Sequence, residues 1–420
     1  MSALITFRLF SFLGSLCLIL ALLFLIWISS RAGYAAFLVA SAASNYDLAR
    51  AKAAVDLSPK NPEAHFILGG LLEASGDGAA AMPHYQAAVA LRGEDYVLWI
   101  QLARSRELEG DVAGAINAAR SAVNLAPFYA QPRWQLGNIL VRAGQQDEGF
   151  AELRLAGAAD PTLLPGIIDL AWQISGGDAE FVKRAIQPRT SESYLALGDY
   201  LKKRGLVLEA IAMFTFAGDH DDVSQARAQY TAELISAKKF KEAYSLWTSG
   251  AAEYTRPPGT LTDPGFELET NLEKPGFGWR QENKASSLSL SLDDSHTREG
   301  KWSLKIESKG DSDPGLPIIS QLVLVEPQMH YQLTFAARAD KFVTGGPPAV
   351  LVRDAESDVV LGGSRVAIQE NQDWREYTID FTTGKSTTAI RIALQREPCS
   401  SSPCPAFGDL WLDGFSLQKQ

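Results

Sequence analysis

The chain has little of the material on which many catalytic and nucleic-acid-binding sites depend. Its 420 residues include only 5 histidines, 3 cysteines and 4 methionines. Acidic residues (49) outnumber basic ones (39), so the net charge is −10. Because contacts to phosphates need clustered lysine and arginine, this balance argues against a nucleic-acid partner. The scattered histidines leave little material for a catalytic metal centre.

Familiar catalytic motifs are missing as well. The sequence has no nucleophile elbow, no HExxH zinc motif and no phosphate-binding loop. The Gly-Gly-Pro-Pro stretch at residues 345–348 lacks the lysine and the following helix of such a loop, so it predicts a turn. The acidic stretches at residues 219–222 and 293–294 are expected in loops, where solvated carboxylates are common. We therefore expect a protein that is not an enzyme.

One long uncharged stretch does occur, from Leu9 to Ile28. Twenty such residues cross the hydrocarbon core of a bilayer as a helix, and the run is longer than the apolar part of an ordinary signal peptide. We predict a retained transmembrane helix at residues 9–28 after a short tail at residues 1–8. Cleavage near residues 32–36 is the alternative. Cys17 follows a leucine and lies inside the apolar run, which favours an unmodified thiol over a lipoprotein signal.

The other two cysteines bear on the orientation of the chain. Cys399 and Cys404 flank a Ser-Ser-Ser-Pro stretch, which suits a local disulfide; two free thiols are the alternative. The charges beside the apolar run, Arg8 and Arg31, barely decide its orientation. Because disulfides persist outside the cytosol, we expect a cytoplasmic amino terminus with the bulk of the chain extracytoplasmic, in a periplasm or at the cell surface.

A pattern repeats every 34 residues between Pro62 and Pro161. Leu-Gly or Leu-Ala pairs begin at Leu68, Leu102 and Leu136, and a glycine follows each pair seven residues later. Small residues let two helices approach closely, and glycine suits the turn between them. The spacing predicts an all-α helix-turn-helix solenoid over residues 33–250. The clear repeats occupy residues 62–95, 96–129, 130–163 and 191–223.

This pattern resembles the tetratricopeptide repeat (TPR) family, most fully in Trp99, Leu102, Gly110, Ala115, Ala122 and Pro127. The resemblance implies a concave groove for an extended segment of a protein partner. The residues that it places in the groove are Phe66, Val97, Ile100, Arg104, Gln131, Trp134, Asn138, Arg142, Leu195, Asp199 and Lys202. Aromatic anchors would supply most of the binding energy, and Arg104 or Arg142 would pair with a carboxylate. Packing of Trp134 on the neighbouring repeat is the alternative.

The composition changes after a linker at residues 251–260. Strict alternation in Leu288–Leu292 is typical of a half-buried strand. Similar segments separated by turn residues predict an all-β antiparallel jelly-roll sandwich over residues 261–420. The further strands are expected at residues 303–307, 319–325, 331–338, 349–353, 374–382, 389–394 and 410–417.

Five segments of this region together resemble the family 4/9 carbohydrate-binding modules, which are galactose-binding-like jelly rolls. They are Asp263–Glu267, Gly278–Trp279, Gly300–Ile306, Trp374–Phe381 and Leu410–Leu417. The resemblance implies a structural Ca²⁺ held by Glu267, the carbonyl of Lys301 and Asp413. Oxygen ligands of this kind suit calcium. The alternative is that these carboxylates only bond backbone amides.

Sugar binding needs exposed rings beside polar groups. The candidates lie at or near predicted loops, and for each a purely structural role is the alternative: Phe277, Trp279, Arg280, Trp302 and Phe407. Trp374 and Trp411 lie in predicted strands and are expected to be core or half-buried residues.

These observations favour a membrane-anchored adaptor of a bacterial-type cell envelope. The repeats would bind a protein partner and the sandwich a carbohydrate, in a setting such as assembly or export of a surface polysaccharide. Two alternatives remain. The protein is a structural scaffold whose sandwich has lost sugar binding, or it is an accessory component of a glycoside-acting enzyme system.

Overall fold

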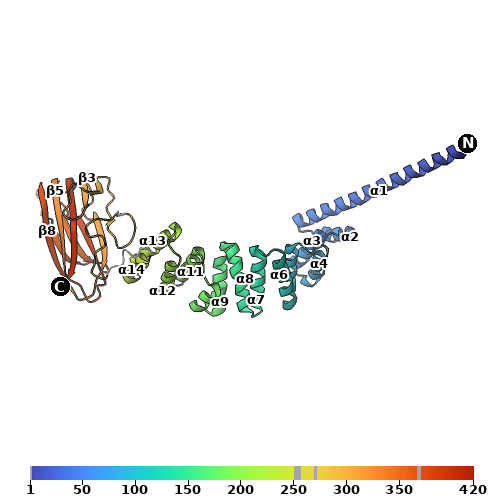
Figure 1. Cartoon of the computed structure of the whole chain (residues 1–420), viewed down its shortest axis with the longest axis horizontal. Helices are drawn as coiled ribbons and strands as arrows, with labels where there is room; N and C mark the ends of the chain where they lie inside the picture. Colours follow the sequence, from blue (N-terminus) through green and yellow to red (C-terminus); the bar gives the residue numbers. More distant parts are fainter. Residues whose placement is uncertain (1, 250–256, 269–271, 367–369) are drawn as a thin grey trace. The chain divides into compact units, whose positions relative to one another are not determined.

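A computed structural model of the chain describes residues 2–249, 257–268, 272–366 and 370–420, with the side chains of the first helix described at residue 16 and from residue 18 onward. The predictions for the Cys17 thiol, for the side chains of residues 9–15 and for linker residues 251–256 fall outside this description. The chain divides into two compact units, Met1–Pro188 and Arg189–Gln420. Figure 1 shows the helices and strands of each unit.

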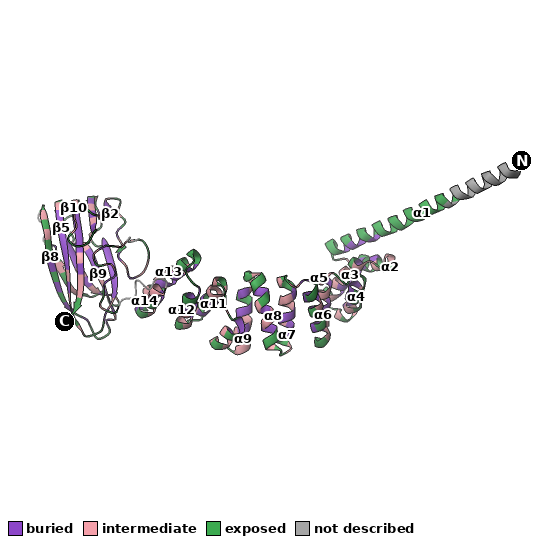
Figure 2. Ribbon diagram, in the orientation of Figure 1, coloured by how far each residue is buried: buried purple, intermediate pink, exposed green. Residues whose placement is uncertain are grey.

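The first unit begins with one continuous helix, α1 (Ser2–Asn45). Its described apolar side chains up to Ile28 are exposed, whereas Ala35, Leu38 and Ala42 farther along are buried (Figure 2). Among the described residues, Leu18–Asn45 is the one helical stretch long and apolar enough to cross a membrane, by length and composition. The predicted transmembrane helix ends at Ile28, before the solenoid begins at residue 33. The helix instead continues, because its later turns bury an apolar face against the helices that follow it.

The predicted helix pairs follow α1. They are built from α2 (Leu48–Leu57), α3 (Pro62–Ala74), α4 (Gly78–Leu91), α5 (Tyr96–Leu108), α6 (Val112–Leu125), α7 (Ala130–Arg142) and α8 (Gln146–Ala159). Side-chain caps begin several of them; the Asn61 carboxamide, for example, accepts the backbone N–H of Glu63 at 3.0 Å. The turn glycines Gly76, Gly110 and Gly144 have φ values of 86°, 82° and 82°, which only glycine adopts readily.

The helix pairs become irregular at the end of the first unit. A 3-10 turn, η1 (Pro161–Leu163), precedes α9 (Leu164–Ser175), and α10 (Ala179–Ile186) has 8 residues where α8 has 14. The second unit opens with four further helices. They are α11 (Ser191–Lys203), α12 (Val207–Phe216), α13 (Asp221–Ser236) and α14 (Phe240–Thr248).

Two five-stranded antiparallel sheets make up the rest of the second unit, which confirms the predicted β-sandwich. Their strand orders are β1-β4-β9-β6-β7 and β2-β3-β10-β5-β8. The strands are β1 (Arg280–Gln281), β2 (Leu288–Asp293), β3 (Ser303–Asp311), β4 (Ile319–Leu324), β5 (His330–Thr344), β6 (Pro348–Asp354), β7 (Val360–Arg365), β8 (Gln372–Thr382), β9 (Ala389–Arg396) and β10 (Pro405–Lys419). A buried apolar core runs along the sandwich, with Phe335 stacked on Phe415 at 5.3 Å.

Three features of the sandwich differ from the expectation. β1 has only two residues, too few for any pattern to be seen. β7 lies at a sheet edge and contains Gly362 and Gly363, so it lacks an apolar face. β10 starts at Pro405 rather than at Leu410. This earlier start places Phe407 in a strand instead of a loop.

Candidate functional site

The start of β10 lies between β3 and β5 in the second sheet. Phe407 is paired directly with Lys309 of β3 and with Val343 of β5. All three side chains are exposed, Phe407 to 51%, whereas the chain neighbours Ala406 and Phe342 are buried. Since side chains alternate between the two faces of a sheet, the three exposed side chains lie together on its outer face. An uncovered aromatic ring therefore lies beside an ammonium group and an aliphatic side chain.

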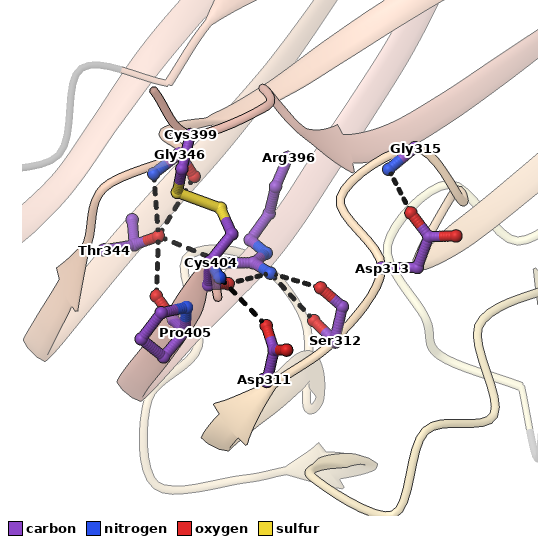
Figure 3. Close-up of a disulfide and its surroundings, with 10 residues drawn as sticks. All are labelled: Asp311, Ser312, Asp313, Gly315, Thr344, Gly346, Arg396, Cys399, Cys404 and Pro405. Atoms are coloured by element: carbon purple, nitrogen blue, oxygen red, sulfur yellow. Dashed lines mark hydrogen bonds between the residues drawn. A yellow bond between two sulfur atoms is a disulfide. The ribbon is translucent and has the colours of Figure 1, made fainter. Parts of the chain in front are cut away.

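A disulfide joins Cys399 to Cys404 just before this strand, with an S–S distance of 2.01 Å (Figure 3). The loop that it closes and residues 311–314 line a cavity of about 530 Å³. The walls are rich in hydroxyl and carboxylate groups, from Asp311, Asp313 and the serines at 400–402. Asp311 is paired with Pro405, two positions along from the Lys309–Phe407 pair. The cavity therefore adjoins the outer face that carries Phe407.

Arg396 links the two segments of the chain that line this cavity. Its guanidinium is fully buried and donates to the carbonyl oxygens of Ser312 and Cys404, at 2.6 Å each, and to the Thr344 hydroxyl at 3.2 Å (Figure 3). Burial lowers the pKa of Arg396, and the charge of Asp311 partly offsets this. The arginine thus ties the end of β3 to the disulfide loop.

The two carboxylates of the cavity are positioned by backbone amides. Asp311 accepts the N–H of Cys404 at 3.2 Å, and Asp313 accepts the N–H of Gly315 at 2.8 Å. An ionised carboxylate can accept several hydrogen bonds, so both groups retain capacity for a ligand hydroxyl. Rigid acceptors beside an exposed ring are the chemistry that recognises a sugar: hydroxyls bond the acceptors and the apolar face of the sugar ring packs on the aromatic side chain.

Two of the predicted sugar-binding aromatics are core residues instead. Trp279 is 2% exposed; it packs on Phe266 and Phe415 and donates its indole N–H to the carbonyl of Asp263 at 2.9 Å. The prediction that Trp279 presents a face to a ligand is therefore wrong, because both faces are covered.

Phe277 is buried for a different reason. It lies in a loop, as expected, but its ring packs edge-on against Tyr244 at 4.9 Å and lies 5.7 Å from Trp247. Both partners belong to α14. The prediction of an exposed Phe277 is wrong because α14, which precedes the sandwich in the chain, covers this loop.

The remaining two sugar-binding candidates, Trp302 and Arg280, are not paired with Phe407 or with its strand neighbours. Trp302 is half-buried, and the Lys301 ammonium lies 4.7 Å from its ring centroid. Arg280 is exposed on β1, in the other sheet, with Glu282 at 4.0 Å. Neither is brought to the cavity beside the disulfide.

Trp411 lies in strand β10, as predicted, but on the outer face of the second sheet. It pairs with Lys305 and Arg338 across the outer face of the second sheet, and both cations lie over its ring, at 5.4 and 5.9 Å. Its N–H donates to Asp293 at 2.6 Å. Burial acts to raise the pKa of Asp293, but hydrogen bonds from Ser295, His296 and Trp411 outweigh it and leave the pKa well below its usual range. Trp411 is buried, yet beneath charged side chains rather than in the core.

The predicted calcium ligands lie in one neighbourhood. Glu267 accepts the backbone N–H of Lys301 at 2.9 Å, and Asp413 accepts those of Arg298 and Gly414, at 2.9 and 2.7 Å. Burial raises the pKa of Asp413, the backbone hydrogen bonds lower it, and the charge of Glu267 raises it further.

These contacts match the alternative in which the carboxylates bond amides, but they also fit a cation. Neither Glu267 nor Asp413 forms an ion pair with another described residue, so their two negative charges remain uncompensated. Among the described residues no group of three or more Asp, Glu, His or Cys side chains is arranged so that the side chains alone could hold a metal ion. Glu267, Asp413 and the Lys301 carbonyl would together supply hard oxygen ligands, which suit Ca²⁺.

The predicted groove of the solenoid is lined by charges that are already paired. Arg104 lies 3.1 Å from Glu73, and Arg142 makes two hydrogen bonds to Glu107, at 2.8 and 2.9 Å. Tyr85 also donates to Glu73, at 3.0 Å. A cavity of about 300 Å³ adjoins the first pair. A partner's carboxylate would therefore have to compete with the glutamates of the repeats.

Other predicted groove residues have mixed placements. Ile100 is buried, so the prediction that it lines an open groove is wrong; its face of α5 packs inward. Phe66 is half-buried, with its ring edge-on to Tyr85. Trp134 is half-buried against Gly166 of α9, the alternative that we weighed for it, and Asn138 donates to the carbonyl of Trp134 at 2.8 Å.

Comparisons with known proteins bear chiefly on the second unit. The model of a family described as "Carbohydrate binding domain" matches residues 239–401, from α14 through β9. No curated protein matches the chain. Similar solved structures include MamA from Desulfovibrio magneticus RS-1, with 15% identity, 44% of this chain and 93% of that chain covered, and a TM-score of 0.31. They also include TmCBM61 in complex with β-1,4-galactotriose, with 18% identity, 39% and 100% covered, and a TM-score of 0.28. The chain thus contains repeated helix pairs in its first unit and, in its second unit, a β-sandwich over most of which the model of the carbohydrate-binding-domain family matches.

Proposed function

We propose that this protein is a non-enzymatic, membrane-anchored adaptor of the cell envelope whose sandwich binds an uncharged polysaccharide. The observation that carries the proposal is the exposed Phe407 ring on the outer face of the sheet, next to the cavity closed by the Cys399–Cys404 disulfide. The family match over residues 239–401 supports a carbohydrate as the ligand class.

The remaining parts of the proposal follow from the other segments. The apolar half of α1 anchors the chain, and a disulfide suits an extracytoplasmic sandwich. The first helices of the repeats offer a groove with Arg104 and Arg142 to a protein partner. A structural Ca²⁺ is held by Glu267, the Lys301 carbonyl and Asp413. Assembly or export of a surface polysaccharide is a setting in which such an adaptor would operate.

Calorimetric titration of the full chain tests the sugar site. The protein is held in a detergent without a sugar head group, so that the detergent does not compete, and is titrated with soluble β-1,4-galactan, xylan, mixed-linkage glucan and dextran. We expect saturable binding to at least one glycan and a loss of about tenfold or more in Phe407→Ala, equivalent to about 1.4 kcal/mol.

Phe128→Ala is the matched control, because Phe128 is also an exposed phenylalanine, at 91%, but lies in the first unit. Binding that survives in Phe407→Ala would place the sugar elsewhere on the sandwich. No binding to any of the glycans by a folded protein would favour a structural scaffold instead.

A further inference from the structure

The two sheets of the sandwich have four edge strands, and three of these carry features that hinder pairing with another chain. β1 has only two residues, β7 contains Gly362 and Gly363 and has a register shift in its ladder with β6, and β8 exposes Asp373 and Arg375. Short strands, irregular ladders and charged side chains are the usual means by which proteins keep edge strands from associating. The fourth edge strand, β2, has none of these features over residues 288–292.

Leucine and serine alternate along β2, which pairs with β3 without a register shift. The leucines face the core: Leu288 is buried, whereas Leu290 and Leu292 pack against the core but are only half-buried. Ser289 and Ser291 are exposed on the outer face. The strand thus presents a regular, uncharged edge whose apolar side chains are incompletely covered.

The backbone of β2 has hydrogen-bonding groups on the side away from β3. By continuation of the β2–β3 register, Ser287 lies opposite Lys309, and its carbonyl accepts the N–H of Lys309 at 2.8 Å. Because hydrogen-bonded and non-hydrogen-bonded pairs alternate along an antiparallel ladder, Leu290 and Leu292 direct their N–H and C=O groups away from β3. Within the part of the chain that the structure describes, these groups make no hydrogen bond.

We propose that β2 pairs antiparallel with β2 of a second copy of this chain, about a two-fold axis at Leu290. In this register the Leu290 residues of the two copies exchange backbone hydrogen bonds, and the N–H of each Leu292 donates to the carbonyl of Leu288 in the other copy. The N–H of Leu288 is not needed, since it already donates within its own chain. The strand is self-complementary: leucines meet on the core side, and Ser289 meets Ser291 on the outer face.

The charge of the strand favours a second copy as the occupant of this edge. Asp293 is the one charged residue of β2, and the register places it opposite Ser287 of the other copy, so no like charges meet across the axis. The six residues of β2 are fewer than the roughly 20 to 30 per side of a standard interface, so the contact is weak by itself. Anchoring in one membrane, as proposed above, raises the effective concentration of the copies and favours the pairing.

Pairing through β2 joins the second sheets of two copies into one sheet of ten strands, five from each copy. The two-fold axis is perpendicular to this sheet, so the outer faces of both copies, with both Phe407 rings, point to the same side. A long polysaccharide can then contact both copies at once, which increases its apparent affinity. The β2 pairing itself does not rest on sugar binding, so the two proposals fail independently.

Disulfide cross-linking of the full chain in dioleoylphosphatidylcholine vesicles tests the register. Two differently tagged forms, both with Cys17→Ser, carry Ser289→Cys or Ser291→Cys; they are reconstituted together and oxidised with copper phenanthroline. We expect a covalent dimer that contains both tags, because the Cα atoms of a directly opposed, non-hydrogen-bonded pair lie about 4.5 Å apart. Either form alone should give no dimer, since its two cysteines would lie diagonally, about 7 to 8 Å apart, beyond the reach of a disulfide.

Thr378→Cys mixed with Thr382→Cys is the matched control. Both threonines are exposed on β8, the other edge strand of the same sheet, and would be opposed if that edge paired about Asp380. This mixture measures chance collisions and should give no product. Absence of the mixed dimer of Ser289→Cys and Ser291→Cys, or an equal yield from the β8 mixture, would overturn the proposal.

Paired charges test the same register without a covalent bond. A chain with both Ser289→Lys and Ser291→Lys places like charges opposite each other across the axis, and so does a chain with both Ser289→Glu and Ser291→Glu. Since both serines are exposed, these substitutions leave the fold intact. Two tagged wild-type copies should co-purify from membranes, and two copies of either variant should not.

The lysine variant mixed with the glutamate variant should regain co-purification, and high salt should weaken it. Undiminished co-purification of the lysine variant with itself, or no recovery in the mixture, would show that β2 does not pair with a second copy. A wild-type chain that does not co-purify with itself would also overturn the proposal and leave this edge to a strand of a different protein.

Discussion

His65 and His84, which lie 19 residues apart in the sequence, form a hydrogen-bonded pair between two helices. Their Nδ1 atoms lie 3.0 Å apart, and Nε2 of His65 lies 2.9 Å from the carbonyl oxygen of Pro59. Because a carbonyl only accepts, His65 carries its proton on Nε2, and its Nδ1 accepts the N–H of His84. A second proton on His65 would place two N–H groups against each other. The pair joins α3 to α4.

This pair predicts that the protein loses stability in mild acid. Burial lowers the pKa of His84 from its ordinary 6.5, and the charges of His65 and Lys52 add to the effect. A group with a lower pKa in the folded state binds its proton less readily there than in the unfolded chain. The stabilisation is therefore complete above pH 6.5 and decreases as the pH falls below it. Melting temperatures at pH 7.5 and 5.5 should differ more in the wild type than in His84→Gln. An equal difference in both would contradict the prediction.

The carboxylates at Glu267 and Asp413 predict a stabilising effect of calcium. Two uncompensated charges near each other gain from a divalent cation, and at about one hundred times its dissociation constant a ligand adds about 2.7 kcal/mol of stability. Added Ca²⁺ should raise the melting temperature of the wild type but not that of Asp413→Asn, which keeps the shape and loses the charge. Mg²⁺ at the same concentration is the control for ionic strength. If chelation leaves the wild-type melting curve unchanged, the residues act only through backbone hydrogen bonds.

At the scale of single residues, the sequence predicted which motif residues lie together better than it predicted which side chains are exposed. The Glu267, Lys301 and Asp413 motif residues do lie together, because local motifs at strand ends fix their neighbours. The exposure of the aromatic side chains was harder to predict. Whether Phe277 or Phe407 is exposed depends on α14 and on where β10 begins, and neither can be read from the residues beside them. The ion pair of Arg104 with Glu73, 31 residues earlier, could not be predicted either, because it depends on how neighbouring helix pairs pack.

Among the elements, the helix pairs depend on glycine at their crossing points. A Cβ atom at Gly137 would lie 2.7 Å from Leu153 Cγ and 2.9 Å from the carbonyl oxygen of Gly149. The 34-residue period identified such positions from the sequence, because close helix packing excludes larger side chains. The period could not predict that α10 would have only 8 residues where α8 has 14, because the sequence of that block departs from the repeat.

Gly137→Ala should therefore destabilise the solenoid by about 1 to 3 kcal/mol through overpacking of α7 on α8. Gly70→Ala is the matched control within a first helix, because its Cβ would meet only the Tyr85 hydroxyl at 3.8 Å. That substitution should be neutral or stabilise by up to about 1 kcal/mol, as alanine favours a helix over glycine. Denaturant unfolding of the full chain, followed by circular dichroism at the helical band, measures both. Equal midpoints for the two variants would show that the crossing tolerates a methyl group.

At the scale of the whole molecule, the last helix of the solenoid packs on a loop of the sandwich that follows it in the chain. The family match begins at residue 239, within the last helix pair, rather than at residue 261. Tyr244 and Trp247 of α14 pack on Phe277, and a Cβ atom at Gly276 would collide with the Trp247 ring. The last helix therefore serves as a cover for the sandwich, a role that its repeat-like sequence does not reveal.

The orientation of the whole chain is the prediction on which the envelope function depends. The chain has three cysteines, and two of them form the disulfide next to the candidate sugar site. In a Cys17→Ser background, a membrane-impermeant maleimide should label Cys399 and Cys404 in spheroplasts of producing cells only after an impermeant reductant is added. A Ser2→Cys substitution in a chain that also lacks Cys399 and Cys404 supplies the opposite control, since it should be labelled only after lysis. Labelling of Cys399 and Cys404 without reductant, and only after lysis, would place the sandwich in the cytosol. An extracellular polysaccharide could then not be its ligand, whatever the affinity measured with the purified protein.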